Sequence, residues 1–359
     1  ETVSARKLWE RIIETRFRTG EPYLNFIDTA NKDLPQPLKD LGLKINGSNL
    51  CAEIHLPTNA DRTAVCCLSS LNLEYYDEWK DTTIVRDLIR MLDNVLQYFI
   101  DNAPDTISRA RYSASRERSI GLGAMGFHSL LQKHGVAWES DKASEINGVV
   151  FKHIKSEAVA ESELLAKERG EYLDGVGTGR RNAHLLAIAP TVSNSVICGG
   201  ISAGIEPLPA NIYTFNGAKG TFIRKNKVLQ SILTEKGEDK DKWWDQMLAE
   251  DGSVQGLPDN ILSPEEKELF LTFPEINQLE LVRQAAIRQR YIDQTQSLNL
   301  SFDVNDSPKW INQVHLEGWK LGIKTFYYLS AVPRRAISCV TIPPKALTPS
   351  RIRSGVGWQ

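Results

Sequence analysis

The sequence predicts an α/β protein in which helices cover a parallel sheet or barrel. Short apolar runs bounded by polar, glycine or proline residues are typical of buried strands, and they occur at 184–189, 297–302 and 322–328. Longer stretches with apolar residues at every third or fourth position indicate helices. Strands that alternate with helices along the chain usually pair in parallel, which gives this fold class.

Three helices follow from periodicity and end signals. The stretch 88–100 has one apolar face, and a second long helix is expected over 143–169. A third should begin after Ser263, because serine is a good N-cap, Pro264 suits the first helical position and the glutamates that follow favour the first turn. These helices form the scaffold.

The composition excludes several classes of protein. The chain has 359 residues with 43 Lys and Arg against 45 Asp and Glu, so nothing in its charge favours binding to nucleic acid. No run approaches the roughly 20 apolar residues of a membrane span, and the first residues lack the apolar stretch of a signal peptide. We expect a cytoplasmic protein that binds neither nucleic acid nor membrane.

The sequence also indicates how the chain is divided into a main unit, an insertion and a C-terminal arm. Residues 225–260 are charged and weakly periodic, so we interpret them as a surface insertion within a unit that spans 1–330. Residues 331–359 are rich in Pro, Arg and Ser and are predicted to form an extended arm. The five cysteines are odd in number and lack paired metal-ligand spacing, so we expect free thiols and no metal site; they are Cys51, Cys66, Cys67, Cys198 and Cys339.

The stretch 121–126 fits the letters of a dinucleotide-binding fingerprint, Gly-x-Gly-x-x-Gly. We reject this interpretation because the preceding residues are polar and do not form a convincing strand. No acidic residue follows on a second strand at the expected distance.

A thiol, a carboxylate and an amide occur at alternate positions in Asn49, Cys51 and Glu53. In an extended conformation all three side chains would point the same way. A cysteine can carry out nucleophilic or one-electron chemistry, and a glutamate can accept a hydroxyl proton. From these residues alone, the more usual explanation is a buried cysteine beside a solvated glutamate.

Two further features could carry function. The loop Thr191, Val192, Ser193 and Asn194 follows a predicted strand and could present N–H groups and hydroxyls to a phosphate, or it could be a plain turn with a capping serine. Tyr327 and Tyr328 end the last predicted strand. They could place one ring in the core and one at the surface, or act as redox-active phenols.

Taken together and in this order, these features resemble the large catalytic subunit of class I ribonucleotide reductase. The resemblance covers essentially the whole chain but only the later part of the family's sequence. The segments that carry it are 16–23, 49–53, 66–73, 181–190, 204–207, 291–294 and 324–328. It implies the C-terminal part of a ten-stranded α/β barrel, built from two five-stranded halves, with a central finger loop near 45–60.

The resemblance also implies site residues. Cys51 would become a thiyl radical that removes the hydrogen at C3′ of the ribose, Glu53 would take the 3′-hydroxyl proton, and Asn49 would hold the substrate hydroxyls. Cys66 would be one of the two thiols that reduce the 2′ position. The loop 191–194 would bind the substrate's phosphates, and the pair 327–328 would pass the radical to the cysteine.

Partners follow from the same resemblance. We expect an N-terminal half of the catalytic subunit on another chain, a metal-containing small (beta) subunit that supplies the radical, and an oligomer. The substrate would be a ribonucleoside diphosphate, no cofactor would be bound in this chain, and an external dithiol such as thioredoxin or glutaredoxin would be the reductant. The family's C-terminal cysteine pair is not matched, since Cys339 has no neighbouring cysteine; either the reductant docks differently or such a tail is not included in this sequence.

Two other functions remain open at this point. The chain could belong to an adenosylcobalamin-dependent reductase, which needs no tyrosine relay. It could also be a non-catalytic assembly protein descended from a reductase, although such a protein would have no need to keep the set of Asn49, Cys51, Glu53, Cys66 and the tyrosine pair together.

Overall fold

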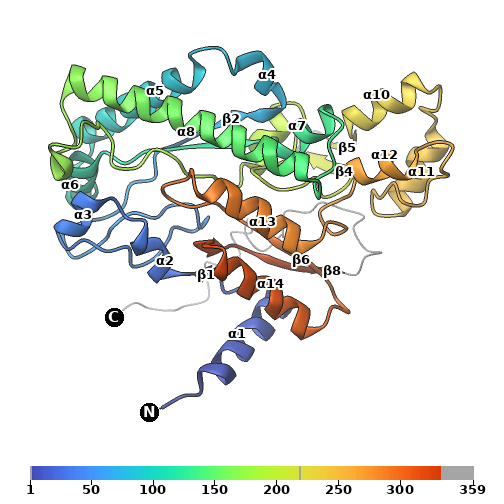
Figure 1. The fold of residues 1–359 in the computed structure, drawn as a ribbon, viewed down its shortest axis with the longest axis horizontal. Helices are drawn as coiled ribbons and strands as arrows, with labels where there is room; N and C mark the ends of the chain where they lie inside the picture. Colours follow the sequence, from blue (N-terminus) through green and yellow to red (C-terminus); the bar gives the residue numbers. More distant parts are fainter. Residues whose placement is uncertain (1, 218–219, 333–359) are drawn as a thin grey trace.

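The computed structural model describes residues 2–217 and 220–332. Most of the predicted arm at 331–359, together with Cys339, lies outside the described residues. None of the described helices combines the length and the apolar character needed to cross a membrane. Figure 1 shows the long helix α8 (Asp141–Arg169) across the top of the molecule and α1 (Ala5–Thr19) projecting at the bottom with the N-terminus at its far end.

The centre of the fold is a set of parallel segments. Strand β2 (Leu68–Asn72) pairs in parallel with β3 (Gly121–Met125). A parallel bridge joins Leu122 of β3 to Leu186. The backbone next to this bridge adds hydrogen bonds, since the N–H of Leu122 donates to the carbonyl of Leu185 at 2.7 Å. The segment that carries Leu186 is therefore the third member of the set.

The set continues through the last third of the chain. Ile188 bridges Gln296 in parallel, which adds a fourth segment. The N–H of Tyr327 donates to the carbonyl of Leu298 at 2.8 Å, which adds a fifth. Three strand pairs also occur among the described residues: β6 (Leu300–Asp303) with β8 (Leu329–Val332) in parallel, β1 (Leu24–Asn25) with β7 (Thr325–Phe326) in antiparallel orientation, and β4 (Ile212–Gly217) with β5 (Gly220–Lys225) in antiparallel orientation.

These five parallel segments agree with one half of the predicted barrel. The predicted strands are present but shorter than expected. The stretch 184–189 pairs only through single bridges, β6 begins at Leu300 rather than 297, and β7 covers only Thr325–Phe326 of the stretch 322–328. Curvature accounts for this, because a strongly twisted sheet breaks the regular ladder into short pairs.

The glycines at 121 and 123 serve strand packing. Gly121 and Gly123 lie within the fully buried strand β3, so the stretch 121–126 is itself largely strand. A Cβ at Gly123 would lie 2.4 Å from the carbonyl oxygen of Ala187, and one at Gly121 would lie 2.3 Å from a methyl group of Leu68. Only glycine permits this approach of neighbouring segments.

Helices pack on the outside of the sheet. The predicted helix 88–100 is α5, the helix 143–169 is α8, and α8 packs against both α5 and α13. The helix predicted after Ser263 is α12, and its capping box joins Ser263 to Glu266. The further helices are α2 (Ile27–Lys32), α3 (Gln36–Asp40), α4 (Tyr76–Trp79), α5 (Ile84–Asn102), α6 (Ser108–Glu117), α7 (Phe127–Lys133), α9 (Val192–Ile197), α10 (Lys227–Glu235), α11 (Asp241–Ala249), α12 (Pro264–Leu269), α13 (Gln278–Gln289) and α14 (Pro308–Lys320), with short 3₁₀ turns at Leu73–Tyr75, Asp105–Ile107 and Leu173–Gly175.

The segment 225–260 forms a lobe with a core of its own. Helices α10 and α11 account for much of it, and Trp244 and Met247 of α11 are buried together with Leu229 and Leu233 of α10. The lobe lies at the right of Figure 1, beside α12. We expected a surface insertion here, and the structure adds that its apolar side chains pack together in a core that joins α10, α11 and residues further along the chain.

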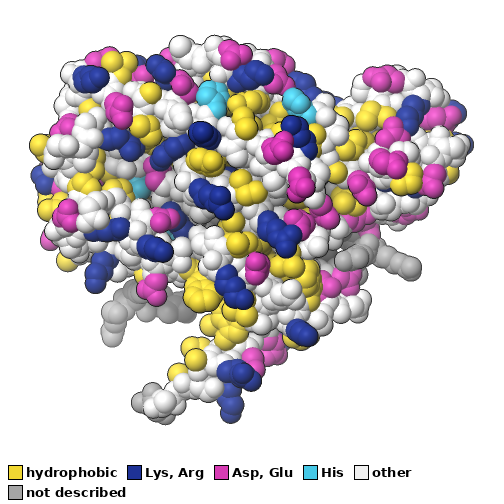
Figure 2. All heavy atoms as spheres, viewed as in Figure 1, with side chains coloured by type: hydrophobic (Ala, Val, Ile, Leu, Met, Phe, Trp, Pro, Cys, Tyr) yellow, Lys and Arg dark blue, Asp and Glu magenta, His cyan; other side chains and the backbone are white. Residues whose placement is uncertain are grey.

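Charges of both signs are interspersed over the face seen in Figure 2, including the lobe. This distribution agrees with the near-balanced composition of 43 basic and 45 acidic residues. Neither sign of charge dominates this face. A surface that binds a polyanion would typically carry an excess of positive charge.

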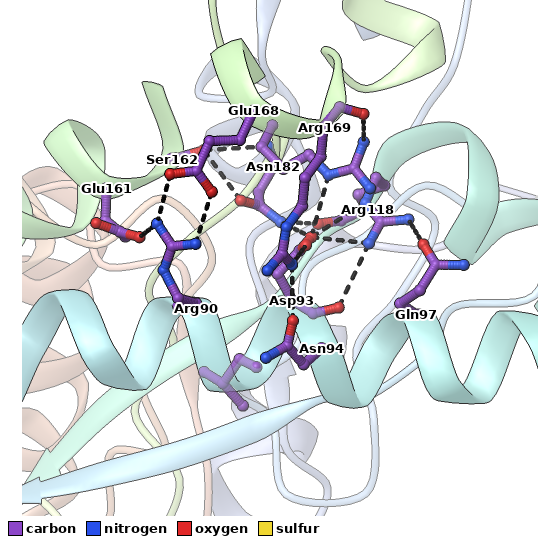
Figure 3. Close-up of polar contacts among 12 residues, drawn as sticks. Arg90, Asp93, Asn94, Gln97, Arg118, Glu161, Ser162, Glu168, Arg169 and Asn182 are labelled. Atoms are coloured by element: carbon purple, nitrogen blue, oxygen red, sulfur yellow. Dashed lines mark hydrogen bonds and ion pairs between the residues drawn. The ribbon is translucent and has the colours of Figure 1, made fainter. Parts of the chain in front are cut away.

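A buried carboxylate joins the helices to the sheet (Figure 3). The side chain of Asp93 on α5 is fully buried and meets Arg118 at 2.8 Å, Arg169 at 3.0 Å and Arg181 at 3.4 Å. Asn182 donates to the same carboxylate at 3.2 Å. These partners come from the end of α6, the end of α8 and the segment before residue 184. Burial would raise the pKa of Asp93, but the charges of Arg118 and Arg181 and the hydrogen bonds from Arg118 and Asn182 hold it below its usual range.

We predict that Asp93→Ala lowers the free energy of unfolding by about 3–5 kcal/mol, because three guanidinium groups lose their buried counter-charge. Denaturant unfolding measures this loss. Since the folded pKa of Asp93 is depressed, its contribution should be present above the unfolded value of about 3.9 and should fade as the pH falls further. Glu168→Ala, which removes the half-exposed partner of Arg90, is the control and should cost much less.

Candidate active site

The segment around Cys51 is a turn. The carbonyl of Asn49 accepts from the N–H of Ala52 at 3.1 Å, and Ala52 has a φ of 60°. The Oδ1 atom of Asn49 accepts from the N–H groups of Glu53 at 3.0 Å and Ile54 at 3.1 Å. The expected extended conformation of residues 49–53 is therefore wrong. A short amide side chain closes the turn on its own backbone, as asparagine commonly does.

Hydroxyl groups of the central segments hold this turn in place. Ser297 Oγ donates to the carbonyl of Cys51, and Thr325 Oγ1 donates to the carbonyl of Ala52 at 3.1 Å. Both donors belong to neighbouring members of the parallel set. The turn is thus fixed to the inner side of the sheet, which is the arrangement expected of a finger loop.

Glu53 is the buried acid of the site. Its side chain is 2% exposed, and Asn49 and Ser297 contact its carboxylate. The Oε2 atom is buried with no hydrogen-bond partner among the described residues. Burial raises the pKa of Glu53, which makes it a stronger proton acceptor than a solvated carboxylate.

The thiols of Cys51 and Cys66 belong to the same electrostatic environment. Burial and the nearby charge of Glu53 raise the pKa of Cys51, and the same two causes raise the pKa of Cys66 to about 11. The charge of Cys51 also acts on Cys66. The structure therefore brings these three side chains together, and both thiols are protonated at neutral pH.

The adjacent cysteines have opposite orientations. Cys66 is exposed, whereas Cys67 is 8% exposed and its Sγ donates to the carbonyl of Leu92 at 3.6 Å. Burial and the charge of Asp93 raise the pKa of Cys67 to about 11. Successive residues at the start of a strand point to opposite faces, so only Cys66 faces the site.

Three tyrosines form a cluster beside the Cys51 thiol. The rings of Tyr327 and Tyr328 lie with their centroids 4.4 Å apart, and the ring of Tyr23 lies 4.7 Å from the first and 4.8 Å from the second. The phenol of Tyr327 is a hydrogen-bond partner of Cys51. Burial is the largest cause that raises the pKa of both Tyr23 and Tyr327, so both remain phenols. The two rings of the pair differ in burial, with one in the core and one nearer the surface, since Tyr327 is 8% exposed and Tyr328 is half-buried.

Sequence reasoning did not single out Tyr23 or Ser297 as site residues. Tyr23 lies near the start of the chain, and long-range contacts such as the pairing of β1 with β7 and the bond from the N–H of Leu329 to the carbonyl of Gly20 bring it to the pair. Ser297 is an ordinary strand residue by its sequence context. The presence of Tyr23 in one of the segments that carry the family resemblance was the one available signal.

The loop 191–194 ends the third central segment. Thr191 has a φ of 44°, and its Oγ1 accepts from the N–H of Gly204 at 2.8 Å. Val192, Ser193 and Asn194 are exposed at the first turn of α9. Ile188 bridges Gln296, and the N–H of Tyr327 donates to the carbonyl of Leu298, so the start of this loop lies level with Tyr327 across the parallel set.

The fold and the site define a parallel α/β barrel unit with a thiol-bearing loop inside it. The family model described as "Ribonucleotide reductase, barrel domain" matches residues 1–175 and 173–329. The chain therefore belongs to the ribonucleotide reductase family.

Known relatives agree with this assignment. The chain is 49% identical over 332 residues to the ribonucleoside-diphosphate reductase large subunit of Invertebrate iridescent virus 3, and 32% identical over 386 residues to that of Caenorhabditis elegans. The matches cover 91% and 97% of this chain but 52% and 48% of those proteins. The structure is similar to the class Id ribonucleotide reductase alpha subunit of Actinobacillus ureae, with a TM-score of 0.86, 41% identity, and coverage of 91% of this chain and 61% of that one.

We predict that iodoacetamide modifies Cys66 of the native chain well before Cys67, because only Cys66 is exposed. The rate at Cys66 should rise about tenfold per pH unit below its pKa of about 11, since the thiolate is the reactive form. Fragment-ion mass spectrometry distinguishes the two neighbours. Equal labelling of both would contradict the opposite orientations, and denatured protein, in which both should react, is the control.

Proposed function

We propose that this chain forms part of the catalytic subunit of a ribonucleoside-diphosphate reductase, which reduces ribonucleotides to deoxyribonucleotides for DNA synthesis by thiyl-radical chemistry. One observation carries the proposal. The Cys51 thiol shares one site with the Glu53 carboxylate, the Cys66 thiol and the Tyr327 phenol.

The protonation states support hydrogen-atom transfer. Tyr327 and Cys51 are neighbours, and the pKa of each is raised, so each carries its hydrogen at neutral pH. An oxidised Tyr327 can then take the hydrogen atom of the Cys51 thiol without separating charge. Tyr328 and Tyr23, whose rings lie within 5 Å of Tyr327, extend the relay.

The remaining residues act on the ribose. The Cys51 thiyl radical removes the hydrogen at C3′, and Glu53 accepts the 3′-hydroxyl proton at its Oε2 atom. Asn49 uses its Oδ1 atom to close the turn, so its Nδ2 group faces the Glu53 carboxylate, and the second N–H of this group is the donor to the substrate hydroxyls. Close placement on one loop lets abstraction and deprotonation act on one carbon.

Reduction of the 2′ position consumes two thiols. Cys66 supplies one, and the 2′-hydroxyl leaves as water while the two sulfurs join in a disulfide. Cys67 points to the core and cannot be the second thiol, which we assign to an N-terminal half on another chain. An external dithiol of the thioredoxin or glutaredoxin type, found in the cytoplasm, restores the pair.

The surface supports such a partner. Among the described residues, no strand pairs with β2 on the side away from β3. Leu50 at the tip of the turn is 77% exposed, and Ile197 at the end of α9 is 82% exposed. An open sheet edge and exposed apolar side chains favour a covering chain. The proposal also includes a radical-generating small subunit, oligomerisation, and binding of the substrate diphosphate at the loop 191–194.

The tyrosine cluster favours this function over a cobalamin-dependent reductase, which generates its radical beside the substrate and needs no relay. The group of reactive residues in this chain likewise favours an enzyme over an assembly protein, because a scaffold gains nothing from a buried carboxylate beside two thiols.

We predict that Cys51→Ser abolishes nucleotide reduction in the assembled enzyme and leaves binding of a ribonucleoside diphosphate unchanged. A hydroxyl does not yield its hydrogen atom as a thiol does. Product formation by chromatography and binding by calorimetry test this. Cys198→Ser, which changes an exposed thiol just after α9, is the control; residual turnover in Cys51→Ser above background would refute the radical role.

We also predict that Tyr328→Phe lowers turnover by more than about 100-fold with unchanged substrate affinity, because phenylalanine cannot be oxidised at a phenol. Steady-state kinetics and calorimetry measure the two effects. Tyr98→Phe, at a tyrosine that is 71% exposed on α5, should retain full activity. A Tyr328→Phe enzyme with normal turnover would exclude the relay.

A further inference from the structure

Glu206 is a partly buried carboxylate that the proposed chemistry does not use. It follows the turn that begins at Gly204, and its N–H donates to the carbonyl of Ala203 at 3.1 Å. Its Oε1 atom is buried with no hydrogen-bond partner among the described residues. Burial raises the pKa of Glu206 to about 7. A carboxylate in this position needs an explanation.

On one side, the turn with Glu206 is bound to the loop 191–194. The N–H of Gly204 donates to Thr191 Oγ1 at 2.8 Å. Gly204 has a φ of 49°, and a Cβ there would lie 2.9 Å from the carbonyl oxygen of Ala189 and 3.2 Å from that of Pro190. With so little space between them, the two segments must move together.

On the other side, Glu206 is bound to the backbone of the tyrosine pair. Its carboxylate is hydrogen-bonded to the side chain and the backbone of Asn299. The Oδ1 atom of Asn299 accepts from the N–H of Tyr328 at 2.9 Å. Since Oδ1 is the acceptor, the Nδ2 group of the same amide is the donor to Glu206. One side chain therefore links the carboxylate to Tyr328.

A buried arginine, Arg288, acts on the charge of the Glu206 carboxylate. Arg288 on α13 is fully buried, and its Nε donates to Gln296 at 2.6 Å. Its Nη1 and Nη2 atoms have no hydrogen-bond partner among the described residues, and Glu206 is the carboxylate whose charge acts on it. The attraction favours the ionised form of Glu206, which strengthens its hydrogen bond to Asn299.

We propose that Glu206 is a positioning residue that couples occupancy of the loop 191–194 to the placement of Tyr328. The path is a continuous chain of contacts from Thr191 through Gly204, Glu206 and Asn299 to the N–H of Tyr328. Substrate phosphates that order the loop thereby stabilise the hydrogen bond at the relay tyrosine. The inference rests on the proposed function, since it takes the loop as the phosphate site.

Hydrogen–deuterium exchange of the assembled enzyme tests the coupling, with CDP as the ligand and inorganic pyrophosphate as a phosphate-only probe. In the wild-type enzyme, both ligands should slow exchange in peptides covering 189–206 and 323–332, the second of which contains the Tyr328 amide. In Glu206→Gln, the first peptide should remain protected, and the protection of the second should fall at least threefold. A structural defect alone would not produce this selective loss.

Two further variants control the experiment. Asn299→Asp keeps an acceptor for the Tyr328 amide but removes the donor to Glu206, so it should reproduce the loss even if Glu206→Gln folds poorly. Glu275→Gln changes a carboxylate that binds Thr272 and Ser253 in another part of the fold, and it should behave as wild type. In Glu206→Gln, turnover should fall at least threefold while the affinity for CDP stays within twofold.

The outcomes separate the inference from the function. Protection of 323–332 that is equal in wild type and Glu206→Gln overturns the coupling, as does protection of 189–206 alone in the wild type. Absence of protection at 189–206 with either ligand instead refutes the phosphate site and with it the basis of the coupling.

Discussion

The position of one short turn inside the sheet is the constraint on which the rest of the site depends. Ser297 and Thr325 donate to the carbonyls of Cys51 and Ala52, so two members of the parallel set hold the loop from its backbone. Backbone carbonyls within a barrel need donors, because water cannot reach all of them. The same bonds that satisfy this need also place the thiol beside the carboxylate and the tyrosines.

Burial then determines the protonation state of the site. Desolvation is the largest cause of the raised pKa of Cys51, of Glu53 and of Tyr327. Thiol and phenol keep their hydrogens, which suits transfer of hydrogen atoms rather than of ions. Elsewhere in the fold, positive charges offset the effect of burial on a carboxylate. Asp93 is surrounded by three arginines, and its pKa is lowered. The two environments distinguish the uncompensated carboxylate of Glu53 from the paired carboxylate of Asp93.

The arrangement of the chain also explains why distant segments meet. The register of the parallel segments places the start of the loop 191–194 level with the tyrosine pair, although more than a hundred residues separate them in the sequence. Glu206 and Asn299 lie between these two features. The open side of β2 and the exposed Leu50 are consistent with an active site that a second chain completes.

The sequence by itself determined the fold class and the main helices, and it predicted most of the residues that the structure brings together at the candidate site. Apolar periodicity located α5 and α8, and local signals such as Ser263 with Glu266 located a cap, because these features depend on neighbours along the chain. Only the tertiary structure decided the turn at Asn49, the core of the lobe around Trp244 and the place of Tyr23 beside the tyrosine pair. These depend on hydrogen bonds and packing between residues far apart in sequence, whose partners no local pattern can specify.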